Sequence, residues 1–430
     1  MAYNLSTSNP YNNFCSIAET QPIETHMNFE LNNDLKQRVE QLRVFMAQNV
    51  EPMESVFREQ IESAENRFST PPIIEDLKEK AQSEGLWNLF KPIAHGGKLT
   101  NFEYAHLAEI MGRVWWAPEV FNCNAPDTGN METLMLFGTD EHKEQWLKPL
   151  LAGKIRSGFS MTEPDVASSD ATNVRCSIVR DKNDYIINGT KWYTTGGMRD
   201  TCELLIVMGK TDPDNANRHA QQSMVLVPKS TPGVRVVRHV TTFGYDDAPF
   251  GEATITFENV RVPKENILLG EGRGFEIAQR RLGPGRIHHC MRLVGAANRS
   301  LELMLDRVEQ RSTFGKKLSE HQSIREDIAK SWCDIEQARL LTLKAADTID
   351  RHGAKAAWAL ISAIKIVAPT MAQTVIDRSI QAHGGAGLTA DYPLAELFNY
   401  ARQIRFADGP DQVHMMALGR RLVKKHHDHE

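Results

Sequence analysis

The sequence predicts an α+β fold in which a middle β-barrel domain separates two α-helical domains. Apolar residues recur at helical spacing through residues 34–155 and again through residues 271–430. Between them, residues 156–270 carry short runs rich in β-branched and aromatic residues. A helical layer needs a partner for its apolar face, so we expect the two helical segments to pack together as one body. Residues 1–33 form a loose N-terminal arm in this scheme.

The N-terminal α-helical domain, residues 34–155, opens with a clear amphipathic pattern. Leu35, Val39, Leu42 and Met46 fall three or four positions apart, with charged residues between them. This spacing places the four side chains on one face of a helix.

The β-barrel domain, residues 156–270, is predicted from its short apolar runs. The predicted strands are Val174–Val179, Tyr185–Asn188, Leu204–Met208, Ser223–Val227, Val234–Val237 and Ala253–Phe257. The segment 181–184, Asp-Lys-Asn-Asp, has the composition of a hairpin turn between the first two strands. Residues 254–257 alternate polar and apolar side chains, as a half-buried strand does.

The C-terminal α-helical domain, residues 271–430, is predicted to contain long helices. One stripe consists of Ile324, Ile328, Trp332, Ile335 and Ala338. A second helix covers 354–368, and we expect Pro369 to end or kink it. An amphipathic helix over 392–406 then leads to the turn 408–411, Asp-Gly-Pro-Asp, which presents a carboxylate just after the helix ends.

Composition excludes several classes of protein. The chain is 41% hydrophobic and 24% charged, with a formal net charge of −5, and its basic residues are dispersed, so it has no nucleic-acid footprint. No run reaches the roughly 18 apolar residues of a membrane span. The six cysteines are scattered, which favours reduced thiols. Residues 1–26 lack Lys and Arg, so we expect no signal or transit peptide and a cytoplasmic location. We read the histidines at 426–429 as a solvated tail and expect no metal site.

Two segments could carry chemistry. Residues 160–170 contain many hydroxyl and acidic side chains, at the change from helix to strand. They form either an ordinary loop whose side chains cap its own backbone, or the lining of a site for a planar, hydrogen-bonding ring such as a flavin. Residues 191–197, Lys-Trp-Tyr-Thr-Thr-Gly-Gly, are either ordinary barrel core or a surface against such a ring. Neither segment decides between its two interpretations alone.

Taken in order, these motifs and others resemble the acyl-CoA dehydrogenase family from about residue 35 to 425. The matching segments are 161–164, 188–195, 262–266, 270–275, 311–322 and 381–414. In the last of these, glycines at 384, 385 and 387 allow a ligand to approach the backbone closely. The resemblance implies this family's fold, in which the C-terminal domain is a four-helix bundle.

The resemblance also implies FAD, held between the barrel, the C-terminal helices and a neighbouring subunit. Thr162 and either Ser168 or Ser169 would bond the isoalloxazine edge, and Tyr193 and Thr195 would lie against the ring. The adenine and pyrophosphate half would meet Arg311, Thr313, Phe314, Gln322, Gln381, Gly384 and Gly385, with Gln412 a further cofactor contact. A pyrophosphate needs a guanidinium and unpaired N–H groups, which this set offers. No G-x-G-x-x-G opens a βαβ unit, so a Rossmann mode is not expected.

The reaction implied is α,β-dehydrogenation of an acyl-CoA thioester to the trans-2-enoyl-CoA. Electrons would pass to an electron-transfer flavoprotein, and the enzyme would be a homodimer or homotetramer. Most relatives have Glu-Gly-Thr where this chain has Asp408-Gly409-Pro410. Other relatives place the base on the helix near 286–292, which has no carboxylate here, so Asp408 is the predicted α-proton base. We expect burial against an apolar ligand to raise its pKa.

Three questions stay open from the sequence. Relatives commonly have Arg around position 289, and His289 leaves that supporting role unassigned. The variant Ala-Asp-Gly-Pro-Asp most resembles a subgroup whose eukaryotic members are fused to a phosphotransferase-like domain, which we do not expect in these residues. Two other functions also suit the fold: a flavin oxidase resembling nitroalkane oxidase, and a non-catalytic assembly factor.

Overall fold

The computed structural model describes residues 30–427, except for the side chains of 282–284. Most of the predicted arm, residues 1–29, therefore lies outside the described residues, as do residues 428–430 of the predicted tail. Asn33, assigned to the arm, already belongs to the first helix. His426 and His427 close the last helix, α13.

Helices form the N-terminal segment, as predicted. They are α1 (Asn33–Phe45), α2 (Glu54–Ser63), α3 (Pro72–Ser83), α4 (Asn101–Met111), α5 (Ala117–Val120), α6 (Asp127–Phe137), α7 (Asp140–His142) and α8 (Lys148–Leu151). The side chain of Asn32 caps α1 by accepting a hydrogen bond of 2.8 Å from the Leu35 N–H. The four residues of the predicted apolar face, Leu35, Val39, Leu42 and Met46, are all buried.

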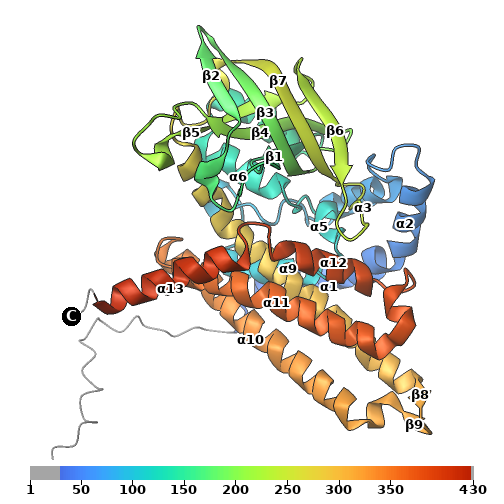
Figure 1. Cartoon of the computed structure of the whole chain (residues 1–430). Helices are drawn as coiled ribbons and strands as arrows, with labels where there is room; N and C mark the ends of the chain where they lie inside the picture. The colour runs from blue at the N-terminus through green and yellow to red at the C-terminus, as the bar shows by residue number, and fades with distance from the viewer. Residues whose placement is uncertain (1–29, 428–430) are drawn as a thin grey trace, which may run out of the picture.

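A curled, barrel-like sheet forms the middle segment (Figure 1). Its strands are β1 (Arg156–Ser160), β2 (Ser177–Asp181), β3 (Asp184–Thr195), β4 (Cys202–Lys210), β5 (Gln222–Pro228), β6 (Val234–Val240) and β7 (Glu252–Pro263). They make one seven-stranded sheet in the order β1-β4-β2-β3-β7-β6, with β5 paired to β4. The predicted hairpin is confirmed by the pairing of Asp181 with Asp184. The patterns missed β1, and they began β2 too early, at Val174.

The C-terminal segment consists of long helices and one small hairpin. Its elements are α9 (Gly274–Gln310), β8 (Ser312–Thr313), β9 (Lys316–Lys317), α10 (Gln322–His352), α11 (Trp358–His383), a 3₁₀ turn η9 (Gly384–Leu388), α12 (Leu394–Ile404) and α13 (Asp411–His427). In Figure 1, α9, α10 and α11 run side by side below the sheet, and α12 and α13 cross the side of the bundle that faces it.

The structure departs from two expectations about these helices, since Pro369 does not end its helix and Trp332 is not buried. Pro369 lies inside α11, which continues to His383, because burial among neighbouring helices outweighs the one backbone hydrogen bond that proline removes. Trp332 does not share the burial of its stripe. It is 58% exposed, whereas Ile335 and Ala338 are buried.

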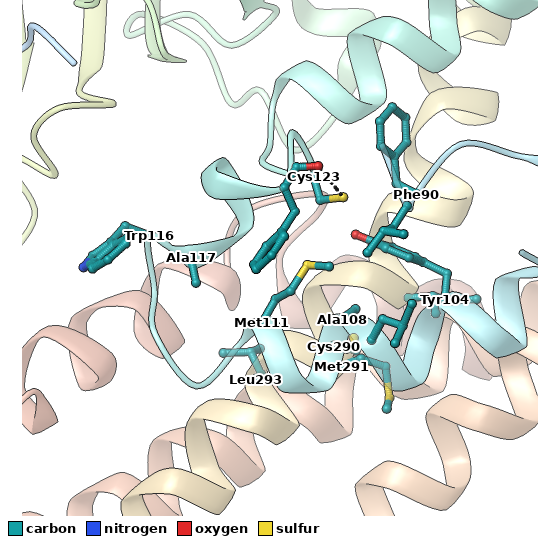
Figure 2. Packing of buried hydrophobic residues seen from close by; sticks show 14 of the residues in the cluster. Phe90, Tyr104, Ala108, Met111, Trp116, Ala117, Cys123, Cys290, Met291 and Leu293 are labelled. Carbon is teal, nitrogen blue, oxygen red and sulfur yellow. Dashed lines mark hydrogen bonds between the residues drawn. The ribbon is translucent and has the colours of Figure 1, made fainter. Parts of the chain in front are cut away.

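One hydrophobic core joins both helical segments. Figure 2 shows Tyr104 and Met111 of α4 beside Cys290, Met291 and Leu293 of α9. The two helices touch through glycine, since a Cβ on Gly112 would lie 2.1 Å from the Arg292 carbonyl oxygen and one on Gly295 would lie 1.9 Å from that of Glu109. No larger residue fits at either position. The helical segments therefore form one body, as expected.

One stretch among the described residues, Trp358–Leu388, is long and apolar enough to cross a membrane by length and composition. More than half of its most apolar 18-residue window is buried inside the bundle, and a core helix meets the same criterion, so the finding is weak evidence for a span. Within residues 30–427, no group of three or more His, Cys, Asp or Glu side chains could hold a metal ion.

Candidate active site

A cavity of about 1050 Å³ lies where the sheet meets both helical segments. Its walls come from α6, from the loop after β1, from the end of β3, from α9 and from the α12–α13 turn. The lining is largely apolar with inserted charges. Phe159, Trp192 and Phe250 face it, and so do Arg281, Arg286 and Asp408. The space is thus built for a ligand with a large apolar surface and a few polar contacts.

Every residue predicted to meet the isoalloxazine lines this cavity: Thr162, Ser168, Ser169, Tyr193 and Thr195. The Ser168 hydroxyl already accepts a hydrogen bond of 2.9 Å from the Glu163 N–H and so closes its own loop. Ser169 is exposed. The contrast favours Ser169 over Ser168 as the one that meets a ligand, and the choice between them stays a prediction.

The loop that carries Thr162 is fixed by a buried ion pair. The Lys191 ammonium lies 2.7 Å from the Glu163 carboxylate, and both side chains are buried. The same carboxylate accepts hydrogen bonds from the N–H groups of Arg175 and Cys176, at 2.7 and 2.9 Å. Thr162 in turn donates to the Trp192 carbonyl at 2.7 Å. Glu163 and Lys191 therefore shape the loop and are not available as acid or base.

Asp408 occupies the turn between α12 and α13 and lines the cavity. Its φ of 57° lies in the left-handed region, where Asp is tolerated better than most residues. Its side chain is 18% exposed, with the carboxylate 3.9 Å from Nε2 of His289. Its carbonyl accepts a hydrogen bond of 3.2 Å from Nε of Arg286. The predicted base thus has its carboxylate in the cavity and its backbone tied to α9.

The pKa of Asp408 depends on burial and on the charges around its carboxylate. Burial alone would raise it, but the positive charges of Lys365, Arg281 and Arg286, together with His289 when protonated, hold the pKa below its ordinary value. Burial also lowers the pKa of His289 to about 4, so its ring is uncharged at neutral pH and becomes charged only as the pH falls toward the range where Asp408 titrates. The prediction of a raised pKa concerned the base with an apolar ligand bound, and it stays a prediction. It took only the apolar ligand into account, because the cations that surround Asp408 come from distant parts of the sequence.

The supporting cation that the sequence left unassigned at position 289 is found at Arg286, one helical turn earlier. Its Nε reaches the backbone of Asp408, whereas Nδ1 of His289 lies 3.3 Å from the Tyr400 hydroxyl. Gly285 of α9 also faces the carboxylate, since an added Cβ there would lie 3.9 Å from Oδ2 of Asp408. The other candidate carboxylate, Asp411, is engaged by Arg405 at 2.7 Å.

Sequence reasoning missed two acids that line the cavity. Glu252 of β7 accepts hydrogen bonds of 2.8 and 2.9 Å from the Thr195 hydroxyl, and burial raises its pKa to about 7. Burial likewise raises the pKa of Asp247 to about 6, although Gln403 donates to it at 2.8 Å. Neither residue belongs to a recognisable motif, so only the pairing of β3 with β7 and the placement of α12 could bring them here.

The predicted adenine and pyrophosphate contacts lie elsewhere. None of Arg311, Thr313, Phe314, Gln322, Gln381, Gly384, Gly385 and Gln412 is among the described residues that line the cavity. Figure 1 places the β8–β9 hairpin, which carries Thr313, at the end of the bundle farthest from the sheet. Phe314 beside it is 95% exposed. Such outward positions suit contact with a group held by another subunit, and their role stays a prediction.

The residues present fit the two halves of FAD in two different ways. The cavity offers hydroxyl groups and apolar walls for a flat ring system. At the other set, Gly384 and Gly385 have no heavy atom within 4 Å of an added Cβ, so the backbone there is open to a ligand. A single chain therefore has one surface suited to the flavin ring and another suited to the dinucleotide half, and the two surfaces are separate.

Models of three consecutive protein domains match this chain across nearly all its length. The acyl-CoA dehydrogenase N-terminal domain matches residues 32–154, the middle domain 158–260 and the C-terminal domain 272–423. The chain belongs to the acyl-CoA dehydrogenase family. The boundaries of the three domains agree with the helical, barrel and helical segments described above.

Individual relatives agree with this membership. Mouse acyl-CoA dehydrogenase family member 10 is 56% identical over 391 residues, which cover 90% of this chain and 36% of the relative. A probable acyl-CoA dehydrogenase of Mycobacterium tuberculosis, FadE2, is 56% identical over 356 residues, covering 82% of this chain and 86% of the relative. The chain spans less than half the length of most of the curated relatives it matches, 36–49% for those of animals and plants.

Solved structures share the fold. That of a putative acyl-CoA dehydrogenase from Mycobacterium abscessus is 47% identical, with a TM-score of 0.90, covering 93% of this chain and all of the other. Butyryl-CoA dehydrogenase from Megasphaera elsdenii is 26% identical, with a TM-score of 0.78, covering 92% of this chain and all of the other.

Proposed function

We propose that this protein is an FAD-dependent acyl-CoA dehydrogenase that converts an acyl-CoA thioester into its trans-2-enoyl-CoA. The observation that carries the proposal is the position of Asp408. Its carboxylate faces the same cavity as Thr162, Ser169 and Thr195, the residues placed to meet a flavin. A base and a ring-binding surface across one apolar space are what removal of a proton and a hydride from neighbouring carbons requires.

Each group of the chain has a defined task in this reaction. FAD, when bound, supplies the acceptor for the β-hydride. Asp408 takes the α-proton, and the cations around it keep its carboxylate ionised and ready to accept. An acyl chain that fills the cavity removes water and so strengthens the base by raising its pKa. Arg286 holds the backbone of Asp408 so that the carboxylate keeps its direction.

Electrons then leave through an electron-transfer flavoprotein, and the working protein is a homodimer or homotetramer. The outward position of the predicted dinucleotide contacts, such as Phe314, supports the oligomer, since these residues are better placed to contact the FAD of a neighbouring subunit than the FAD of their own subunit. The intact carboxylate and the complete cavity lining argue against a non-catalytic assembly factor.

The test is anaerobic reduction of the bound flavin. The purified protein is expected to be yellow, and its flavin absorbance should bleach when acyl-CoA thioesters of short, medium, long and branched chains are added in turn. Mass spectrometry should then find the enoyl-CoA. A protein that binds no FAD after reconstitution, or a loaded protein that no acyl-CoA reduces, would contradict the proposal.

Oxygen consumption separates the dehydrogenase from an oxidase of the same fold. A dehydrogenase turns over with a dye or flavoprotein acceptor and consumes little oxygen without one. Rapid oxygen uptake with nitroalkanes, and no reduction by acyl-CoA, would instead favour the oxidase.

A further inference from the structure

Lys365 is the charged residue of an otherwise apolar stretch, residues 358–372, of α11. It lies on α11 between Ile364 and Ala368, and its side chain is fully buried. Removing an ammonium group from water costs several kcal/mol unless hydrogen bonds and opposite charge compensate for it. A lysine at this position therefore needs partners, and they lie in the α12–α13 turn.

The Lys365 ammonium donates hydrogen bonds to two backbone carbonyls of that turn. One is the carbonyl of Ile404, the last residue of α12, at 2.5 Å, and the other is that of Ala407, at 2.7 Å. The last carbonyls of a helix have no partner within the helix, and the helix dipole makes that end attractive to a cation. Lys365 thus caps α12 and holds the peptide that leads directly into Asp408.

The turn needs such support because its backbone is strained. Asp408 and the following Gly409 both have positive φ, 57° and 101°. Left-handed residues other than glycine cost on the order of 1–3 kcal/mol and persist where surrounding contacts enforce them. The carbonyl of Asp408 itself is held by Arg286 at 3.2 Å and approached by the ring of His414 at 3.1 Å. Lys365 fixes the peptides before the base, and these two fix the one after it.

We propose that Lys365 is the positioning residue of the α-proton base, because it caps α12, fixes the backbone that enters Asp408, and places a positive charge behind its carboxylate. The inference rests on the proposed function and extends it, since it assigns a role to a residue that touches neither substrate nor cofactor. Replacement of Lys365 by an apolar residue should both loosen the base and raise its pKa.

The other charged or titratable groups around the base stay in place in such a variant. They are Arg281, Arg286, His288, His289 and Cys290 from α9, Tyr400 from α12, and Asp411 and His414 from α13. Two guanidinium groups therefore remain, so the carboxylate should still ionise near neutral pH. The change expected is a shift of the acid limb of the pH–rate profile to higher pH.

The experiment compares Lys365→Met, Lys365→Gln and Lys365→Arg with wild type in the FAD-loaded protein. The rate of flavin bleaching by a saturating acyl-CoA is followed from pH 5 to pH 9 by stopped flow. Lys365→Met should be slower by about 10- to 100-fold, as expected when a reacting group is misplaced by about 1 Å. Its acid limb should move to higher pH, and Lys365→Arg should recover most of both effects. Lys355→Met, at an exposed lysine just before α11, is the matched control.

Lys365→Gln separates charge from folding. It keeps donors for the carbonyls but has no charge, so it should fold even if Lys365→Met does not, and its acid limb should still move. If all folded variants keep the wild-type pH profile and differ only in melting temperature, Lys365 is merely structural and the inference is wrong. If wild type itself is not bleached by any acyl-CoA, the proposed function fails instead.

Discussion

The imidazole of His289 joins the predicted base to α12: its Nε2 lies 3.9 Å from Oδ2 of Asp408, and its Nδ1 lies 3.3 Å from the hydroxyl of Tyr400. Because burial lowers the pKa of His289 to about 4, the ring meets the carboxylate as a neutral group at pH 7. The long distance and the missing charge make this a weak contact. At the lower pH where the carboxyl itself titrates, His289 is the largest of the charges that lower the pKa of Asp408, followed by Lys365, Arg281 and Arg286.

His289→Leu should therefore have a small effect. We expect the rate of flavin bleaching to fall by less than about 10-fold, since a hydrogen bond between neutral groups contributes about 1 kcal/mol. The acid limb of its pH–rate profile should nevertheless move to higher pH, as in Lys365→Met, because His289 is the largest of the charges that lower the pKa of Asp408. An acid limb that stays at its wild-type position would mean that His289 does not become charged beside the base, and would contradict this prediction.

Asp408→Asn should abolish dehydrogenation and leave FAD bound. Asn has nearly the same shape and tolerates the left-handed backbone of residue 408, but it cannot accept a proton at neutral pH. Loss of a general base typically costs about 10²–10⁴-fold in rate. Stopped-flow bleaching measures the loss, and the flavin spectrum checks the loading. Wild-type bleaching in this variant would reject the assignment, and the search would turn to Asp411 and Glu163, although both are held in ion pairs.

If neighbouring subunits share each FAD site, two inactive variants should complement each other in a mixed oligomer. Asp408→Asn removes the base, and Arg311→Glu should weaken FAD binding in the neighbouring subunit. In a mixed oligomer, a subunit with an intact base can receive Arg311 from a partner that lacks the base. Co-expressed variants should therefore recover part of the activity that each lacks alone. No recovery, together with light scattering that finds an active, FAD-loaded monomer, would contradict a shared site.

Because the pKa of Glu252 is raised, we expect the stability of the FAD-free protein to depend on pH. This pKa is raised from 4.5 to about 7, so between these values the folded state binds more protons than the unfolded state. The contribution of Glu252 to the free energy of unfolding should therefore be largest below pH 4.5 and be lost as pH rises through 7. Glu252→Gln stays neutral and removes this loss, so at pH 8 it should gain about 2–3 kcal/mol relative to wild type.

Urea denaturation at pH 5 and pH 8 tests this dependence. Most of the gain should vanish at pH 5, where wild-type Glu252 is largely protonated. Glu258→Gln, at an exposed position of the same strand, is the control and should show little change at either pH. An equal effect of Glu252→Gln at both pH values would show that its carboxyl ionises normally. Asp247, whose pKa is about 6, adds a slope of the same sign in both proteins.

The sequence alone determined the order of domains and the identity of the candidate base. Periods of 3.6 and 2 residues are local, so they predicted the helical, barrel and helical segments without any tertiary information. The Asp408 turn is an ordinary turn by its local pattern, and it was assigned as the base through the resemblance of residues 381–414 to the acyl-CoA dehydrogenase family. The loop residues from Thr162 to Ser169 were found in the same way, as a compact motif.

Only the tertiary structure decided the electrostatics of the site and the path of α11. The pKa of Asp408 depends on Arg281, Arg286 and Lys365, which lie 127, 122 and 43 positions earlier in the chain and meet it only when α9, α11 and α12 pack together. Pro369 failed to end its helix because packing in the core outweighed a local preference. A periodic pattern reports which face of a helix is apolar, but a charge acts through space on whatever the fold brings near it.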